Sequence, residues 1–174
     1  MADLWEAIAG DATAESELWR DCLLPAESRE RCPVFSILGD DRHALGLETI
    51  YEGYLVHYGR PRLFAPPDED TALLLGDYLY AHGLVRIADG HEVAAVADLS
   101  ELISLCSQLR AEDADGDGPL WAATAALLGR GALDEPRSAL RLRSDPTALD
   151  AAARETVGDD AVEAALAAHA GRVG

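Results

Sequence analysis

Helical periodicity constrains this chain more than any other feature of its sequence. Between residues 47 and 58, apolar side chains recur at the three- and four-residue spacing that places them on one side of an α-helix. They are Leu47, Ile50, Tyr51, Tyr54, Leu55 and Tyr58. A similar period returns along much of the chain, and no segment alternates apolar and polar residues as a half-buried strand does. The sequence therefore predicts an all-α protein.

Cap and turn residues divide the rest of the chain into further helices. We expect short helices near residues 4–10, 18–23 and 121–128, longer ones from about 68 to 86 and 91 to 110, and C-terminal helices within 145–171. Asp68 or Asp70 is expected to cap the segment that runs to about residue 86, and Asp145 followed by Pro146 is a good start for a later helix. Segment 91–110 is apolar on most of its circumference, which predicts a central position. Residues 1–174 are expected to form one helical bundle.

Charge and composition exclude several functional classes. The chain has 14 basic and 32 acidic residues and a formal net charge of −18, which disfavours binding to nucleic acid or to an anionic membrane. Every basic residue is arginine, so Schiff-base chemistry and a phosphate-loop lysine are excluded. The three cysteines form no Cys-x-x-Cys pair, and no apolar run reaches the roughly 18 residues of a membrane span. We therefore expect a cytoplasmic protein.

Residues 45–132 resemble the trans-isoprenyl (polyprenyl) diphosphate synthases in the order of several motifs. Residues 48–52 (Glu-Thr-Ile-Tyr-Glu) stand where that family has Asp-Asp-x-x-Asp, and residues 57–61 (His-Tyr-Gly-Arg-Pro) stand where it has Arg-Arg-Gly-x-Pro. Residues 75–79 (Leu-Gly-Asp-Tyr-Leu) match a helix that begins Gly-Asp-x-Leu-Leu, and 107–108 (Ser-Gln) match Gly-Gln. The resemblance implies a shortened, isoprenoid-synthase-like helical bundle.

The same resemblance implies which residues would meet a prenyl diphosphate and its metal. Glu48 and Glu52 would bind Mg²⁺, because side chains four residues apart project from one face of a helix. Arg60, Arg62 and Gln108 would contact the diphosphate. The alternative for Glu48 and Glu52 is a pair of solvated glutamates at the edge of the apolar stripe.

Departures from the family pattern shape the functional hypotheses. Thr49 replaces the second carboxylate, His57 and Tyr58 replace the paired arginines, and a chain without lysine lacks the family's N-terminal Gly-Lys-Arg motif. We therefore expect a catalytically degenerate accessory or regulatory subunit, similar to the small non-catalytic component of heterodimeric heptaprenyl diphosphate synthases. Such a chain would form a homodimer, or a heterodimer with a full-length prenyl synthase. The alternatives are a magnesium-dependent enzyme or binder that acts on an allylic prenyl diphosphate, and an all-α interaction module without a ligand.

An acidic loop supports one further hypothesis. Asp113, Asp115 and Asp117, with Gly118 close behind, follow the beginning of the calcium-loop pattern of helix–loop–helix proteins. Position 12 of that pattern is Thr124 rather than a bidentate glutamate, and no second loop pairs with it. The loop is thus either a calcium site or a solvated connection between two helices.

Overall fold

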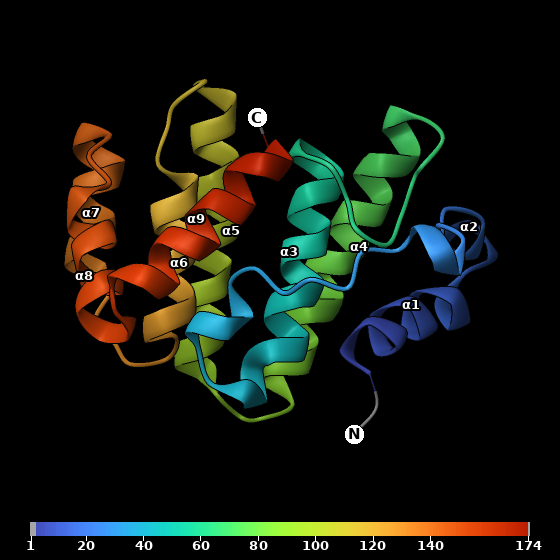
Figure 1. The fold of residues 1–174 in the computed structure, drawn as a ribbon, viewed down its shortest axis with the longest axis horizontal. Coiled ribbons are helices and arrows are strands. Elements are labelled where there is room, and N and C mark those ends of the chain that lie inside the picture. Colours follow the sequence, from blue (N-terminus) through green and yellow to red (C-terminus); the bar gives the residue numbers. More distant parts are fainter. Residues whose placement is uncertain (1–2, 174) are drawn as a thin grey trace.

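The chain folds into nine α-helices over residues 3–173, the part that the computed structural model describes (Figure 1). The helices are α1 Leu4–Glu15, α2 Glu17–Asp21, α3 Ala44–Tyr58, α4 Glu69–Ala88, α5 Val93–Ala111, α6 Asp117–Leu127, α7 Asp134–Arg143, α8 Thr147–Val157 and α9 Asp159–Val173. Three short 3₁₀ turns, Ala26–Ser28, Ser36–Leu38 and Asp41–His43, lie between α2 and α3. About 74% of the residues are helical and no strand forms in the described part, which confirms the all-α prediction.

Cap residues explain several of these boundaries. Asp68 accepts a hydrogen bond from the Thr71 amide at 2.8 Å, as expected for the start of α4. Asp145 accepts one from the Thr147 amide at 3.0 Å at the start of α8. The prediction that the first helix ends at Gly10 was wrong, because α1 continues to Glu15. A glycine inside a helix costs only about 1 kcal/mol, so it need not end the helix, and the continued helix buries Ala12.

Two helices, α3 and α6, lie in the middle of the molecule. Every residue from 46 to 56 on α3 and from 120 to 126 on α6 is buried. Figure 1 shows α1 and α2 at one end, α7 and α8 at the other, and α9 crossing in front of α6. The prediction that segment 91–110 is central was wrong. Helix α5 buries one face, while Val93 is 81% exposed and Ser100 and Ser104 lie at the surface.

Four glycines allow α3 and α4 to approach closely. Gly46 and Gly53 on α3 face Gly83 and Gly76 on α4, and the two glycines of each helix are seven residues apart. A Cβ atom at Gly53 would lie 2.9 Å from the Gly76 carbonyl oxygen, and one at Gly83 would lie 3.0 Å from the Gly46 carbonyl oxygen. The first distance is shorter than real Cβ contacts show and the second is tighter than most, so a side chain at either glycine would push the two helices apart.

Two apolar clusters lie on either side of α3. The larger combines α3 with α5, α6, α8 and α9, and the smaller combines α1, α2, the 59–68 loop and α4. Tyr51 and Tyr54 belong to the first cluster, and Val56 belongs to the second. Helix α3 therefore connects both parts of the core. Within residues 3–173, none of the helices combines the length and the apolar composition that crossing a bilayer requires.

Candidate functional site

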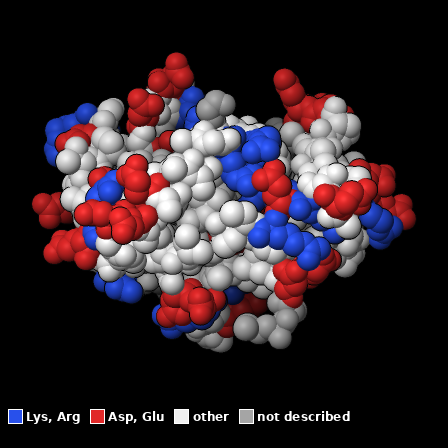
Figure 2. All heavy atoms as spheres, in the orientation of Figure 1, with Lys and Arg blue, Asp and Glu red and all other residues white. Residues whose placement is uncertain are grey.

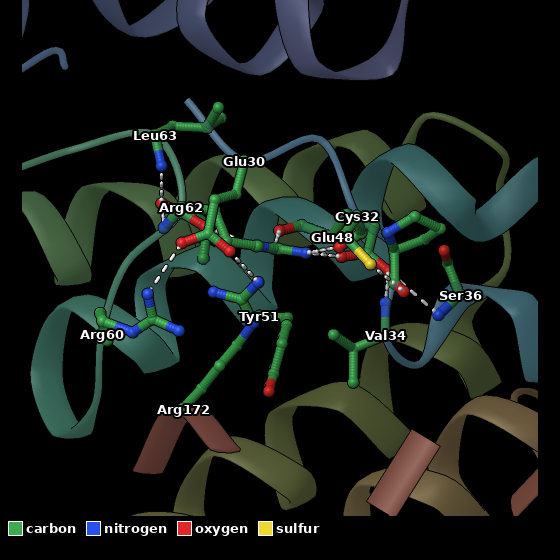
Figure 3. A network of polar contacts seen from close by, with 12 residues as sticks. Glu30, Cys32, Val34, Ser36, Glu48, Tyr51, Arg60, Arg62, Leu63 and Arg172 are labelled. Atoms are coloured by element: carbon green, nitrogen blue, oxygen red, sulfur yellow. Dashed lines mark hydrogen bonds and ion pairs between the residues drawn. The ribbon is translucent and has the colours of Figure 1, made fainter. Parts of the chain in front are cut away.

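Glu48 and Glu52 project from the same face of α3, as their spacing predicts, but they face the protein interior. Both residues are at most 1% exposed, and the fully buried Arg62 lies between them. Arg62 Nη1 is 2.5 Å from Glu48 Oε2, and Arg62 Nε is 2.9 Å from Glu52 Oε2 (Figure 3). We call this group the Arg62 cluster. Its three side chains come from α3 and from the loop that follows it.

Backbone amides occupy the remaining carboxylate oxygens of the Arg62 cluster. Glu48 Oε1 accepts hydrogen bonds from the amides of Val34 and Ser36, at 3.2 and 3.1 Å. Glu52 Oε1 accepts them from the amides of Arg62 and Leu63, both at 2.8 Å. Each of the four carboxylate oxygens thus has a donor from the protein, as buried carboxylates require.

Aromatic rings and carbonyl groups complete the surroundings of Arg62. Its guanidinium carbon lies 4.6 Å from the centre of the Trp5 ring and 5.0 Å from that of Tyr51. Its remaining N–H groups donate to the carbonyl oxygens of Cys32 and Glu48. Burial alone would lower the pKa of Arg62, but the charges of Glu48 and Glu52 raise this pKa above its ordinary value. Arg62 is therefore the permanent cation that neutralises one of the two carboxylates.

The predicted diphosphate contacts do not come together in one place. Arg60 is exposed and its Nη1 lies 2.9 Å from Glu30 Oε1, while Arg172 Nη2 lies 2.7 Å from Glu30 Oε2. Figure 2 shows the face of the molecule that is turned to the viewer in Figure 1. Acidic side chains lie at both ends of this face, and arginines lie between the end of α9 and α1. Gln108 lies at the surface of α5 and donates to Glu112 Oε1 at 3.0 Å. Of the residues expected to hold magnesium or diphosphate, only Glu48, Glu52 and Arg62 share a cluster.

The acidic loop divides its three aspartates between solvent and interior. Asp113 and Asp115 are exposed, whereas Asp117 is the first residue of α6 and turns inward. Asp117 Oδ2 accepts hydrogen bonds from Tyr54 and Arg110, and it lies 3.3 Å from His169 Nε2. Within residues 3–173, no group of three or more His, Cys, Asp and Glu residues is placed to hold a metal ion. The Asp117 carboxylate thus binds other side chains instead of completing a calcium-type loop.

Four helices contribute to this second polar group, the Asp117 cluster. Tyr54 comes from α3, Arg110 from α5, Asp117 from α6 and His169 from α9, and His169 Nδ1 also lies 2.9 Å from the hydroxyl of Tyr51. A hollow of about 250 Å³ opens beside the cluster. Its lining includes Leu109, Arg110, Asp113, Asp115, Asp117 and Val173.

Opposing influences set the pKa values of the Asp117 cluster. Burial raises the pKa of Asp117, but hydrogen bonds from His169 and Tyr54 and the charge of Arg110 lower it by more, so this pKa lies well below its ordinary value. Burial and the neighbouring Asp117 raise the pKa of Tyr54. The carboxylate is therefore ionised and the phenol neutral at pH 7, an arrangement suited to a stable hydrogen bond rather than to proton abstraction by the tyrosine.

The sequence did not indicate which side chains bind Glu48, Glu52 and Asp117. Arg62 and Arg110 lie only 7 to 14 residues from their carboxylates, but those spacings across a turn do not show which side chains face each other. Tyr51 and Tyr54 were recognised only as members of the apolar stripe, and no pattern in the sequence singles out His169.

The sequence also did not indicate a buried ion pair, in which Arg137 Nη1 lies 2.7 Å from Asp98 Oδ1 and the Gly129 amide donates to Asp98 Oδ2. The contacts of Asp98 and of Tyr51 with His169 join residues 31 to 118 apart in sequence, so no local pattern indicates them.

The last polar group lies where α3 ends against α4. His57 Nε2 is 3.3 Å from Asp77 Oδ1, and the His57 ring packs on Gly76, where any side chain would collide with it. The Asp77 side chain is 65% exposed, so this contact lies at the surface.

Comparison with protein-family models, curated proteins and solved structures gives no match to this chain. The geometry of the polar groups described above therefore carries the functional proposal.

Proposed function

We propose that this chain is a non-catalytic accessory subunit of the isoprenyl-diphosphate-synthase type, which acts by binding a catalytic chain. The observation that carries the proposal is the state of Glu48 and Glu52. Magnesium binding needs free carboxylate oxygens, and here Arg62 and four backbone amides use all of them.

The surrounding helices support the same proposal. Segments 44–58 and 69–88, which carry the resemblance to the synthases, form a tightly packed pair through their glycines. The polar groups at the ends of that pair bind one another: Arg60 binds Glu30, and His57 binds Asp77. A scaffold that keeps the helices while its polar side chains bind one another is suited to binding another protein rather than two diphosphates.

The proposal is tested with a purified full-length polyprenyl diphosphate synthase from the same genome. We expect a complex of defined stoichiometry by size-exclusion chromatography with light scattering, and a change in the chain length of the prenyl product when this protein is added. A synthase that elutes separately and makes an unchanged product would refute the accessory role.

The magnesium-dependent alternative makes a different prediction. It requires that Mg²⁺ with farnesyl diphosphate stabilises the folded chain, because a ligand that binds only the native state raises the melting temperature. The internal use of the Glu48 and Glu52 oxygens argues against that outcome.

A further inference from the structure

More than half of the exposed large apolar side chains lie on α4 or at the start of α5. Among the described residues, seven are more than 40% exposed: Leu18, Ile37, Leu73, Leu74, Val85, Val93 and Leu142. Four of these seven lie on α4 or at the start of α5. Exposed apolar side chains are unremarkable when scattered, but a contiguous group indicates a contact surface.

The outer face of α4 carries an exposed stripe that is mainly apolar. Leu74, Ala81, Val85 and Ala88 follow each other at three-, four- or seven-residue spacing and are all exposed, and Leu73 lies beside Leu74. Helix α3 packs against the opposite side of α4, through Gly76 and Gly83. The stripe therefore has no partner within residues 3–173.

A hollow lies at each end of this stripe. Near the start of α4, a hollow of about 440 Å³ is lined by residues that include Val56, His57 and Leu73. Near its end, one of about 180 Å³ is lined by Ala88, His91, Glu92, Val93 and Val96. The exposed side chains of α4 therefore form a ridge with a hollow near each end. Helices pack by inserting the ridge of one into the grooves of the other, so this shape is suited to binding a helix.

Helix α5 extends the surface with small side chains. Figure 1 shows α4 and α5 behind α3 and α6, on the side of the molecule away from the viewer. Ala97, Ser100 and Ser104 are exposed on α5. The hydroxyls of Ser100 and Ser104 donate to carbonyl oxygens of their own helix, at 2.8 and 3.0 Å. They need no outside acceptor, so another helix can approach α5 without leaving a polar group unpaired.

The charged side chains of this surface indicate which kind of partner it binds. Asp70 and Asp77 are the charged side chains within the α4 stripe, and both are acidic. Burial lowers the pKa of His57, although Asp77 raises it in part, so His57 does not neutralise Asp77 at pH 7. Arg86 lies to one side, where it pairs with Asp11.

A second copy of this chain fits the surface poorly. Asp77 lies near the middle of α4, so a two-fold axis through the stripe would bring two Asp77 carboxylates towards each other. Like charges opposed at an interface cost free energy, and each copy carries a net charge of −18. An arginine or lysine on a different chain would instead pair with Asp70 and Asp77.

We propose that the α4 stripe, together with the start of α5, is a docking site for an apolar helix of another protein that presents arginine or lysine to Asp70 and Asp77. Under the accessory role proposed above, on which the identity of the partner rests, the catalytic synthase supplies that helix. The surface itself follows from the exposed side chains, the two hollows and the charges.

Two synthetic helical peptides test the surface without the synthase. Both have the same leucine and alanine seam, and one has flanking arginines where the other has glutamates. We expect fluorescence anisotropy to show that the basic peptide binds the full chain and that the acidic peptide does not. Leu74→Glu combined with Val85→Glu should weaken binding at least about tenfold, since two apolar contacts are replaced by charges.

A matched control separates docking from general attraction to an acidic protein. Leu142 is 75% exposed on α7, outside the surface, so Leu142→Glu combined with Ile37→Glu adds the same charge elsewhere. These control substitutions should change the dissociation constant by less than about twofold. Equal loss in the stripe and control variants, or binding that survives the stripe substitutions, would overturn the docking site.

The same variants distinguish failure of the surface from failure of the accessory role. If the synthase complex forms and survives Leu74→Glu with Val85→Glu, the surface is wrong and the accessory role stands. If the basic peptide binds as expected but the synthase does not, the surface stands and the accessory role fails. If light scattering gives a mass near twice 18.5 kDa that the stripe substitutions halve, the occupant is a second copy and the proposal of a different chain is overturned.

Discussion

The Arg62 cluster and the Asp117 cluster use similar groups in different surroundings. Each pairs an arginine with a carboxylate beside a tyrosine of α3. In the Arg62 cluster all three charged side chains are at most 1% exposed and four backbone amides reach the carboxylates. In the Asp117 cluster the Arg110 side chain is 28% exposed and a hollow adjoins it. Because solvent screens exposed charges more than buried ones, we expect the Arg62 cluster to contribute more to the stability of the fold than the Asp117 cluster.

The largest expected effect comes from removing the cation of the sealed cluster. Arg62→Met leaves two buried carboxylates without a counter-charge, and breaking a buried pair in this way costs about 3–5 kcal/mol. Urea unfolding followed by circular dichroism measures the change.

Arg60→Met is the matched control for that experiment. The Arg60 side chain is 63% exposed in its pair with Glu30, and exposed pairs contribute about 0–1 kcal/mol. Adding Glu48→Gln and Glu52→Gln to Arg62→Met should restore part of the lost stability, because no charge then remains buried. Equal costs for Arg62→Met and Arg60→Met would mean that burial does not distinguish the two arginines.

A smaller and pH-dependent effect is expected at Asp117. Asp117→Asn removes a charge that accepts hydrogen bonds from Tyr54, Arg110 and His169, which should cost about 1–3 kcal/mol at pH 7. The folded-state pKa of Asp117 lies below its ordinary value of 3.8, so ionisation stabilises the fold above that pH. The stabilities of the wild type and the variant should therefore converge as the pH falls below 3.8 towards the folded-state pKa. A difference that is constant with pH would show that the charge is not its origin.

His57 should give a still smaller effect with a different pH range. Burial lowers the pKa of His57 below its ordinary value of 6.5, against a weaker opposing influence of Asp77, so the neutral ring is favoured in the folded state. As the pH falls below 6.5, the unfolded chain takes up the proton first and stability decreases. His57→Phe should remove this part of the pH dependence, as measured by urea unfolding across that range. The Asp117 contribution should remain unchanged in the same variant.

The smallest expected effect is that of magnesium with a prenyl diphosphate. With the oxygens of Glu48 and Glu52 occupied, millimolar Mg²⁺ and farnesyl diphosphate should leave the melting temperature unchanged. Differential scanning fluorimetry checks this. A rise in melting temperature that Glu52→Gln abolishes would instead support the magnesium-dependent alternative.

The sequence predicted the helical class and the orientation of Glu48 and Glu52 relative to each other, since both follow from local periodicity. It did not predict what those carboxylates face. The turn after α3 brings Arg62 next to Glu52. Whether the Arg62 side chain points inward depends on the packing of Trp5 and Tyr51 around it. Asp117 was read as a loop ligand because the sequence does not fix where α6 begins.

The arrangement around Arg62 also bears on the order in which the chain folds. Glu48 and Glu52 lie one turn apart on a helix, and they repel each other until Arg62 and the amides of Val34 and Ser36 arrive from two separate loops. The carboxylates on this side of α3 can therefore be removed from water only after both loops have closed over them. We expect the contacts of Arg62 to form after the transition state, so that substitutions there accelerate unfolding more than they slow refolding.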